Sequence, residues 1–65
     1  MNTARLKGII AENGLSQRDV AKAIGLSEKT FYSKMKKGIF GTDEAEAMIQ
    51  LLKIKDPASI FLQAE

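Results

Sequence analysis

The sequence predicts an all-α protein, a compact bundle of five short helices that forms a single domain over residues 1–65. Three observations favour this fold class. Apolar residues recur three and four positions apart, which gathers them on one face of a helix. Glycines and helix-capping residues interrupt the chain at short intervals. No segment of useful length alternates polar with apolar residues as a half-buried strand does.

The first predicted helix runs from about residue 2 to residue 13. Three apolar side chains at spacing i, i+3, i+4 supply its inner face: Leu6, Ile9 and Ile10. The chain then reaches Asn13-Gly14, which favours the end of a helix because either residue tolerates a left-handed backbone.

The second predicted helix begins at Ser16, whose side-chain oxygen can accept a hydrogen bond from an exposed amide of the first turn. The run Ser16-Gln17-Arg18-Asp19 has the spacing of a capping box in which Asp replaces Glu. The inner face of this helix is apolar: Val20, Ala21 and Ile24. Gly25 ends it.

The third predicted helix begins at Ser27, a second favourable cap, and Glu28 follows near the positive helix end. Phe31 and Met35 lie four residues apart, so we expect both to face the core. Gly38 then ends the helix.

The fourth predicted helix runs from about Thr42 to Lys53. Acidic residues crowd its beginning, where the helix dipole favours anions: Asp43, Glu44 and Glu46. Its inner face carries Ala45, Met48, Ile49 and Leu52. The fifth helix is short and begins at Asp56-Pro57, with Asp56 as the N-cap and proline as the first helical residue, where its missing N–H costs nothing.

The composition argues against several functions. The chain has no cysteine and no histidine, so it lacks disulfides, zinc-thiolate ligands and the commonest general base. We expect no enzyme activity, no cofactor, no metal site and no small-molecule ligand. Asp43 and Glu44 diverge by about 100° on a helix, so the dipole explains them better than a cation does. Apolar runs are too short for a membrane span or a signal peptide, which favours a cytoplasmic protein without membrane contact.

Charge is unevenly distributed along the chain, although the net charge is only +2. Residues 16–38 contain six lysines or arginines and two acidic residues. Residues 39–65 contain two lysines and five acidic residues. The middle of the chain is therefore basic and the last third acidic, and a localised positive field is what a polyanion-binding surface requires.

Gly25-Leu26 joins two short helices, which is the sequence form of a helix-turn-helix. Small Ala21 lets the two helices cross closely, and apolar side chains fill the wedge between them: Val20, Ile24, Leu26 and Phe31. Residues 16–38, SQRDVAKAIGLSEKTFYSKMKKG, resemble the helix-turn-helix family of phage repressors and Cro-type regulators. The flanking helices extend the resemblance over nearly the whole chain. It implies a lambda-repressor-like DNA-binding domain and, as partner, double-stranded DNA.

The resemblance implies that the third helix, about residues 28–37, enters the major groove. The positions that match the family's base-contacting residues are Ser27, Glu28, Lys29, Tyr32 and Ser33. Helical geometry supports this independently, because Lys29 and Ser33 lie about 160° and 200° from Phe31, opposite the core. Two other interpretations stay open: Glu28 as a charge that complements the helix end, and Tyr32 packed sideways on the bundle.

Five residues are candidates for phosphate binding: Gln17, Arg18, Lys36, Lys37 and Arg5. Gln17 matches a family position that binds a phosphate beside the amides of a helix N-terminus. Lysines in the last turn also complement the negative helix end, so Lys36 and Lys37 have a second interpretation as a solvated terminus. The sequence departs from the family pattern at Lys34, where an aliphatic residue is usual and the apolar residue is instead Met35.

The last two predicted helices carry more apolar residues than one stripe can absorb, and two interpretations stay open. The surplus either widens the buried face or forms a homodimer interface at Ile54, Ile60, Phe61 and Leu62. A two-fold dimer would place two third helices about 34 Å apart on a palindromic operator. The sequence thus predicts a sequence-specific transcriptional regulator, a repressor or Cro-like protein. The alternative is a protein-interaction module, such as an antirepressor, that uses the apolar C-terminal helices.

Overall fold

The computed structural model describes residues 1–62, and that part of the chain is helical without strands, which confirms the predicted fold class. The helices are α1 (Thr3–Glu12), α2 (Gln17–Ala23), α3 (Glu28–Lys37), α4 (Thr42–Leu52) and α5 (Ala58–Phe61). The last three residues of the predicted domain, 63–65, lie outside the described residues. No helix within residues 1–62 has the length and apolar character needed to cross a membrane.

The two helix starts predicted at serines are confirmed. The Asp19 amide donates to Ser16 Oγ at 3.0 Å, and the Ser16 amide donates to Asp19 Oδ2 at 2.8 Å, so the capping box is complete. The bond from the Ser16 amide holds the pKa of the Asp19 carboxyl below its ordinary value. At α3, Ser27 Oγ accepts from the Thr30 amide at 3.1 Å. These local bonds set where α2 and α3 begin.

The start of α5 differs from the prediction by one residue. Pro57 occupies the cap position with a helical backbone, and its carbonyl accepts from the Phe61 amide at 2.8 Å. Asp56 contributes its backbone carbonyl, which accepts from the Ser59 hydroxyl at 2.8 Å. Asp56 is therefore not the residue at the cap, because the first helical hydrogen bond starts from the proline carbonyl.

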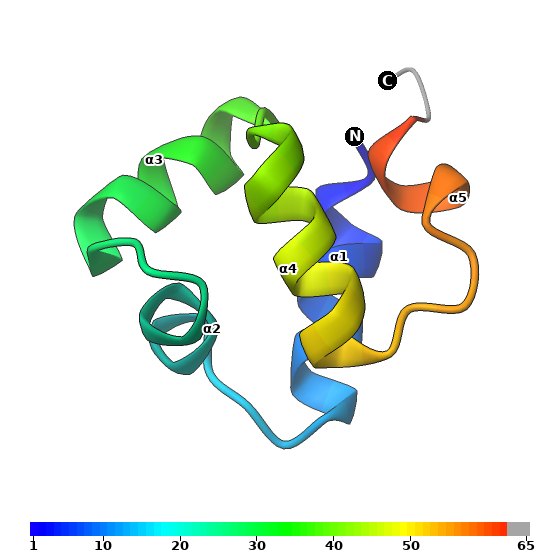
Figure 1. Cartoon of the computed structure of the whole chain (residues 1–65), viewed down its shortest axis with the longest axis horizontal. Coiled ribbons are helices and arrows are strands. Elements are labelled where there is room, and N and C mark those ends of the chain that lie inside the picture. The colour runs from blue at the N-terminus through cyan, green and yellow to red at the C-terminus, as the bar shows by residue number, and fades with distance from the viewer. Residues whose placement is uncertain (63–65) are drawn as a thin grey trace.

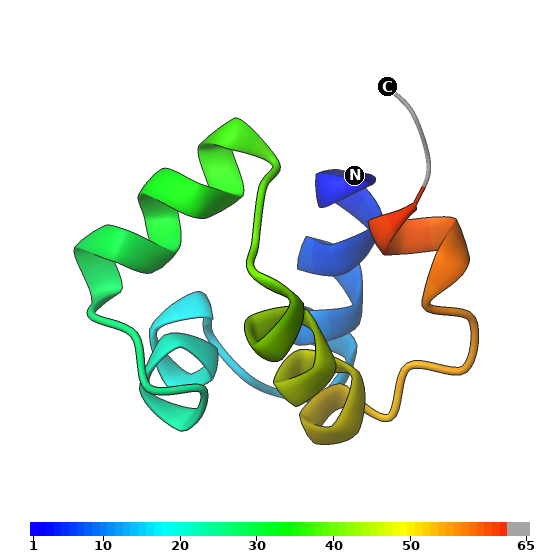
Figure 2. The same ribbon diagram turned by 45° about the horizontal axis from the view of Figure 1, so that its top comes forward.

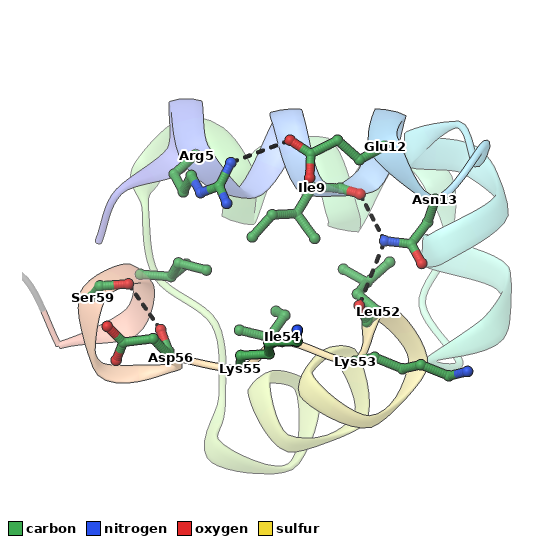
Figure 3. A pocket seen from close by; sticks show the side chains of 11 residues that line it. Arg5, Ile9, Glu12, Asn13, Leu52, Lys53, Ile54, Lys55, Asp56 and Ser59 are labelled. Carbon is green, nitrogen blue, oxygen red and sulfur yellow. Dashed lines mark hydrogen bonds and ion pairs between the residues drawn. The ribbon is translucent and has the colours of Figure 1, made fainter.

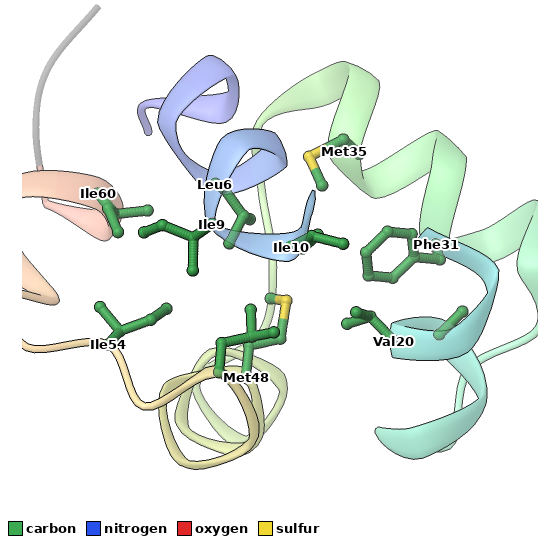
Figure 4. Close-up of a cluster of buried hydrophobic side chains, with 11 residues drawn as sticks. Leu6, Ile9, Ile10, Val20, Phe31, Met35, Met48, Ile54 and Ile60 are labelled. Carbon is green, nitrogen blue, oxygen red and sulfur yellow. The ribbon is translucent and has the colours of Figure 1, made fainter. Parts of the chain in front are cut away.

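One hydrophobic core joins all five helices (Figure 4). The buried residues are Leu6, Ile9, Ile10, Val20, Ala21, Phe31, Met35, Met48, Leu52, Ile54 and Ile60. Phe31 is fully buried, and its ring lies 5.3 Å from the ring of Phe40, centroid to centroid. The predicted inner faces of the first three helices are thus confirmed, apart from Ile24, which is half-buried against the core.

The helices are arranged so that α3 and α5 lie on opposite sides of the molecule, with α1 and α4 between them (Figures 1 and 2). The N-terminus is tied to the C-terminal helix, because the Asn2 amide donates to the Ile60 carbonyl at 2.7 Å. This arrangement leaves α2 and α3 together on the side of the molecule away from α5.

Candidate nucleic-acid interface

The turn between α2 and α3 holds the two helices in the arrangement of a helix-turn-helix. Gly25 has a φ of 82°, a conformation that L side chains rarely adopt, and the Leu26 amide donates to the Ala21 carbonyl at 2.9 Å. Val20 and Ala21 of α2 and Phe31 of α3 are buried in the same core. The motif predicted from residues 16–38 is therefore present in the fold.

The side of α3 away from the core is polar and accessible. Phe31 and Met35 anchor the helix, with exposed fractions of 0% and 3%. The five residues predicted to contact bases are all exposed: Ser27, Glu28, Lys29, Tyr32 and Ser33. The Tyr32 ring also stands edge-on to the Phe31 ring, with centroids 6.3 Å apart. Tyr32 thus combines a sideways contact on the bundle with an exposed fraction of 45%.

Four of the predicted phosphate contacts share this side of the structure. Lys36 and Lys37 are exposed in the last turn of α3, and Gln17 is half-buried in the first turn of α2. Arg18 lies beside one of the residues predicted to contact bases, since its Nε is 3.8 Å from Glu28 Oε2. Both side chains of this pair are largely exposed, so the ion pair contributes little to stability and leaves each charge available to a ligand.

Arg5 lies elsewhere. Its Nη1 donates to Glu12 Oε2 at 3.2 Å, and Glu12 lies about two turns further along the same face of α1. Both side chains border a depression of about 260 Å³ between α1, α5 and the end of α4 (Figure 3). Asn13 and Ser59 also line this depression. The structure therefore does not bring Arg5 together with the exposed face of α3.

Lys34 is a polar residue of α3 that the predicted contacts left out. Its Nζ donates to Glu44 Oε2 at 2.6 Å and to Oε1 at 2.8 Å, which joins α3 to the first turn of α4. The sequence signal was the departure from the family pattern, a lysine in place of an aliphatic residue about 60° from Phe31. That angle places the side chain on the flank of α3, near neither the core nor the outward face.

The C-terminal apolar residues divide between core and surface. Ile54 and Ile60 are buried, with exposed fractions of 9% and 2%, so the prediction that they offer a dimer interface is corrected: they complete the core under α1 and α4. Phe61 is half-buried against that core, whereas Leu62 is 82% exposed. Leu62 borders a hollow of about 350 Å³ together with Ile39, which is 69% exposed.

The acidic first turn of α4 has a structural role through Glu44. Within residues 1–62, no three potential ligands converge on a point that could hold a metal ion. Glu44 instead caps the helix, because Oε1 accepts from the Gly41 amide at 2.8 Å. The bond from Lys34, followed by that from Gly41, lowers the pKa of the Glu44 carboxyl below its ordinary value.

Comparison with known proteins gives one family. A family model described as the antitoxin Xre-like helix-turn-helix domain matches residues 7–53, from within α1 to the residue that ends α4. No curated protein and no solved structure matches the chain. The match spans the whole α2–α3 unit and well over half of the sequence. The chain therefore belongs to the Xre-like helix-turn-helix family and is a DNA-binding regulator.

Proposed function

We propose that this protein is a sequence-specific transcriptional repressor of the Cro or phage-repressor type, which binds an operator with α3 in the major groove. The observation that carries the proposal is the face of α3 opposite Phe31 and Met35, which is polar, basic and exposed. Occupation of the operator would block access of RNA polymerase to the promoter. Helix α3 is long enough to present two turns of side chains to base edges.

Base recognition is assigned to the exposed residues of the first two turns of α3. Lys29 donates to guanine O6 or N7, and Glu28 accepts from cytosine N4. Glu28 also repels phosphates, which penalises incorrect registers on the duplex. Ser33, opposite the core, supplies a hydroxyl group within this face, and Ser27 and Tyr32 supply hydroxyl groups beside it.

Phosphate binding is assigned to residues on either side of α3. Gln17 stands at the N-terminus of α2, where backbone amides favour an anion. Lys36 and Lys37 hold the strand near the C-terminal end of α3, and Arg18 is close enough to act beside Glu28. Arg5 is left out of the proposed interface because it faces the α5 side.

A homodimer on a palindromic operator follows from the small size of one α3 face. A single helix contacts only a few base pairs, so a second copy is needed for a strong and selective complex. Exposed Leu62 and Ile39 line one apolar hollow, which supports this surface as the place where the second copy binds. Sedimentation of the wild type and of Leu62→Ser measures the association directly.

DNA binding tests the proposed function. A preferred duplex is selected from randomised DNA and from fragments adjacent to the protein's own gene, and its affinity is compared with random DNA at two salt concentrations. With roughly four to six phosphate contacts, log affinity falls against log salt with a slope near −0.9 per contact. Failure to prefer any sequence, or salt-independent binding at micromolar protein, would contradict the proposal.

A second candidate function is a protein-interaction module of the antirepressor kind. The same exposed pair, Ile39 and Leu62, favours it, because exposed apolar side chains beside a hollow offer a surface that another protein can cover. The burial of Ile54 and Ile60 removes most of the surface on which this alternative relied. The salt series separates the two functions, since a protein-binding module shows no salt-dependent affinity for DNA.

A further inference from the structure

Three ion pairs occur within residues 1–62, and one is far better shielded from water than the others. The side chains of Lys34 and Glu44 are 34% and 18% exposed, whereas every other paired side chain is about half exposed or more. Lys34 Nζ contacts both carboxylate oxygens, at 2.6 and 2.8 Å. Screening by water is weaker at a shielded site, so this pair restrains its two helices more than a surface pair does.

The carboxylate end of this contact is fixed to the backbone at the start of α4, and the lysine belongs to the last turns of α3. Glu44 Oε1 also accepts from the Gly41 amide, which anchors the carboxylate at the start of α4. On the other side, the Lys34 carbonyl accepts from the amides of Gly38 at 2.8 Å and Ile39 at 3.1 Å, which close the end of α3. The residue whose carbonyl accepts the last hydrogen bonds of α3 thus also ties α3 to α4 through its side chain.

The position of this contact on α3 opposes rotation of the helix about its axis. Phe31 and Met35 hold the inner face by apolar packing, and methionine is a flexible side chain that fills a space without fixing an orientation. Lys34 lies on the flank, about 60° from Phe31, where a polar contact of defined length resists such a rotation. Base-contacting groups lose selectivity when they shift by about 1 Å.

From this geometry we propose that Lys34 and Glu44 form a strut that sets the orientation of α3, which makes Lys34 a positioning residue for sequence recognition and not a phosphate contact. The inference rests on the proposed function, since it concerns how the α3 face meets base edges. It separates Lys34 from Lys36 and Lys37, its two neighbours in the same basic run.

Three variants test the strut. Lys34→Met removes the charge but keeps the apolar stem, Lys34→Arg restores a group that can bond both carboxylate oxygens, and Lys36→Met is the matched control for a phosphate contact. For each, affinity is measured for the selected duplex and for random DNA, at several salt concentrations. Thermal melting verifies that each variant is folded.

The expected pattern distinguishes the two roles. Lys34→Met lowers the ratio of specific to random affinity about tenfold and leaves the salt slope unchanged, and Lys34→Arg retains the wild-type ratio. Lys36→Met keeps the ratio and reduces the steepness of the slope by about 0.9. If Lys34→Met instead keeps the ratio, whether or not its slope changes, the strut does not position α3 for recognition and the inference is overturned.

Amide hydrogen exchange gives a measurement that does not depend on DNA. In Lys34→Met we expect faster exchange at the amides of Gly38 and Ile39, and unchanged exchange at the amide of Leu26 in the turn after α2. Unchanged exchange at Gly38 and Ile39 would overturn the proposal that the Lys34–Glu44 contact restrains α3. A wild type without sequence preference would contradict the proposed function, and the exchange result would still decide whether Lys34 restrains α3.

Discussion

The two sides of this molecule use their side chains differently. On the side formed by α2 and α3, two buried residues, Phe31 and Met35, hold a helix whose other side chains are mostly exposed. On the side formed by α4 and α5, most of the large apolar side chains pack into the core, with Met48, Leu52 and Ile60 buried, and Leu62 remains exposed. The comparison shows that a small chain can leave most of one helix exposed because the rest of the chain supplies most of the core.

The charge distribution follows the same division. The basic stretch 16–38 contains α2 and α3, whereas acidic residues begin α4, where Glu44 is used for capping and for the bond to Lys34. Glu44 therefore contributes to structure at the start of α4, while the lysines of α3 other than Lys34 stay exposed. Four predictions test this division, from the largest expected effect to the smallest.

The anchor of α3 should be the most sensitive point on the binding side. Phe31→Ala removes a fully buried ring and is expected to cost about 3–5 kcal/mol, which equals the whole stability of a domain of this size. Thermal or urea unfolding measures the loss. Tyr32→Ala, at the exposed neighbour, is the control and should leave the protein folded. A melting curve of Phe31→Ala that matches wild type would contradict the assigned core.

The other side should show the contrast between buried and exposed apolar residues. Ile60→Ala is expected to lower the free energy of unfolding by about 2–5 kcal/mol, because it opens a cavity between α5 and α1. Leu62→Ala, two residues away and exposed, should change the stability of the monomer by less than about 0.5 kcal/mol. Equal effects of the two substitutions on urea unfolding would mean that the core does not end at Ile60.

The exposed face of α3 should respond in binding and not in stability. Lys29→Ala is expected to weaken the complex with the preferred duplex by about 1–3 kcal/mol and to relax preference at one base pair, with unfolding unchanged. Titration against the preferred duplex and against single-base variants measures both effects. An equal loss on random DNA would make Lys29 a phosphate contact.

The pH dependence of stability should be modest and confined to acid. Asp19 and Glu44 have ordinary pKa values of 3.8 and 4.5, and the fold lowers both. The folded state therefore binds fewer protons, so these groups stabilise it above the ordinary values and that stabilisation is lost as pH falls through the lowered ones. Urea unfolding between pH 2 and 6 checks this, and Glu44→Gln should flatten the curve. A free energy of unfolding that increases as the pH falls would contradict this prediction.

Local sequence patterns predicted the helices and the helix-turn-helix correctly. Serine caps and glycine stops act over three or four residues, so the starts at Ser16 and Ser27 and the end at Gly38 are visible in the sequence. The start of α5 was missed by one residue, because Pro57 is compatible with the cap position as well as with the first helical turn. The exposed face of α3 was predicted from the four-residue spacing of Phe31 and Met35, which sets the opposite face outward.

Contacts between distant residues could not be predicted this way. Ile54 and Ile60 have the same apolar character as Leu62, and only packing against α1 and α4 distinguishes the buried pair from the exposed residue. Arg5 has the charge of a phosphate contact, but the direction of α1 places it beside α5. Lys34 belongs to a basic run, yet the position of α4 makes it the partner of Glu44.

The sequence by itself determined the helical class, the α2–α3 motif and the polar character of the outward face of α3, because each depends on neighbours within one or two turns. The tertiary structure alone decided which lysine of α3 is tied to α4 and which apolar residues of the C-terminal end are buried. The physical reason is that burial and ion pairing depend on how helices far apart in the chain are placed relative to one another. Residue type does not encode that placement.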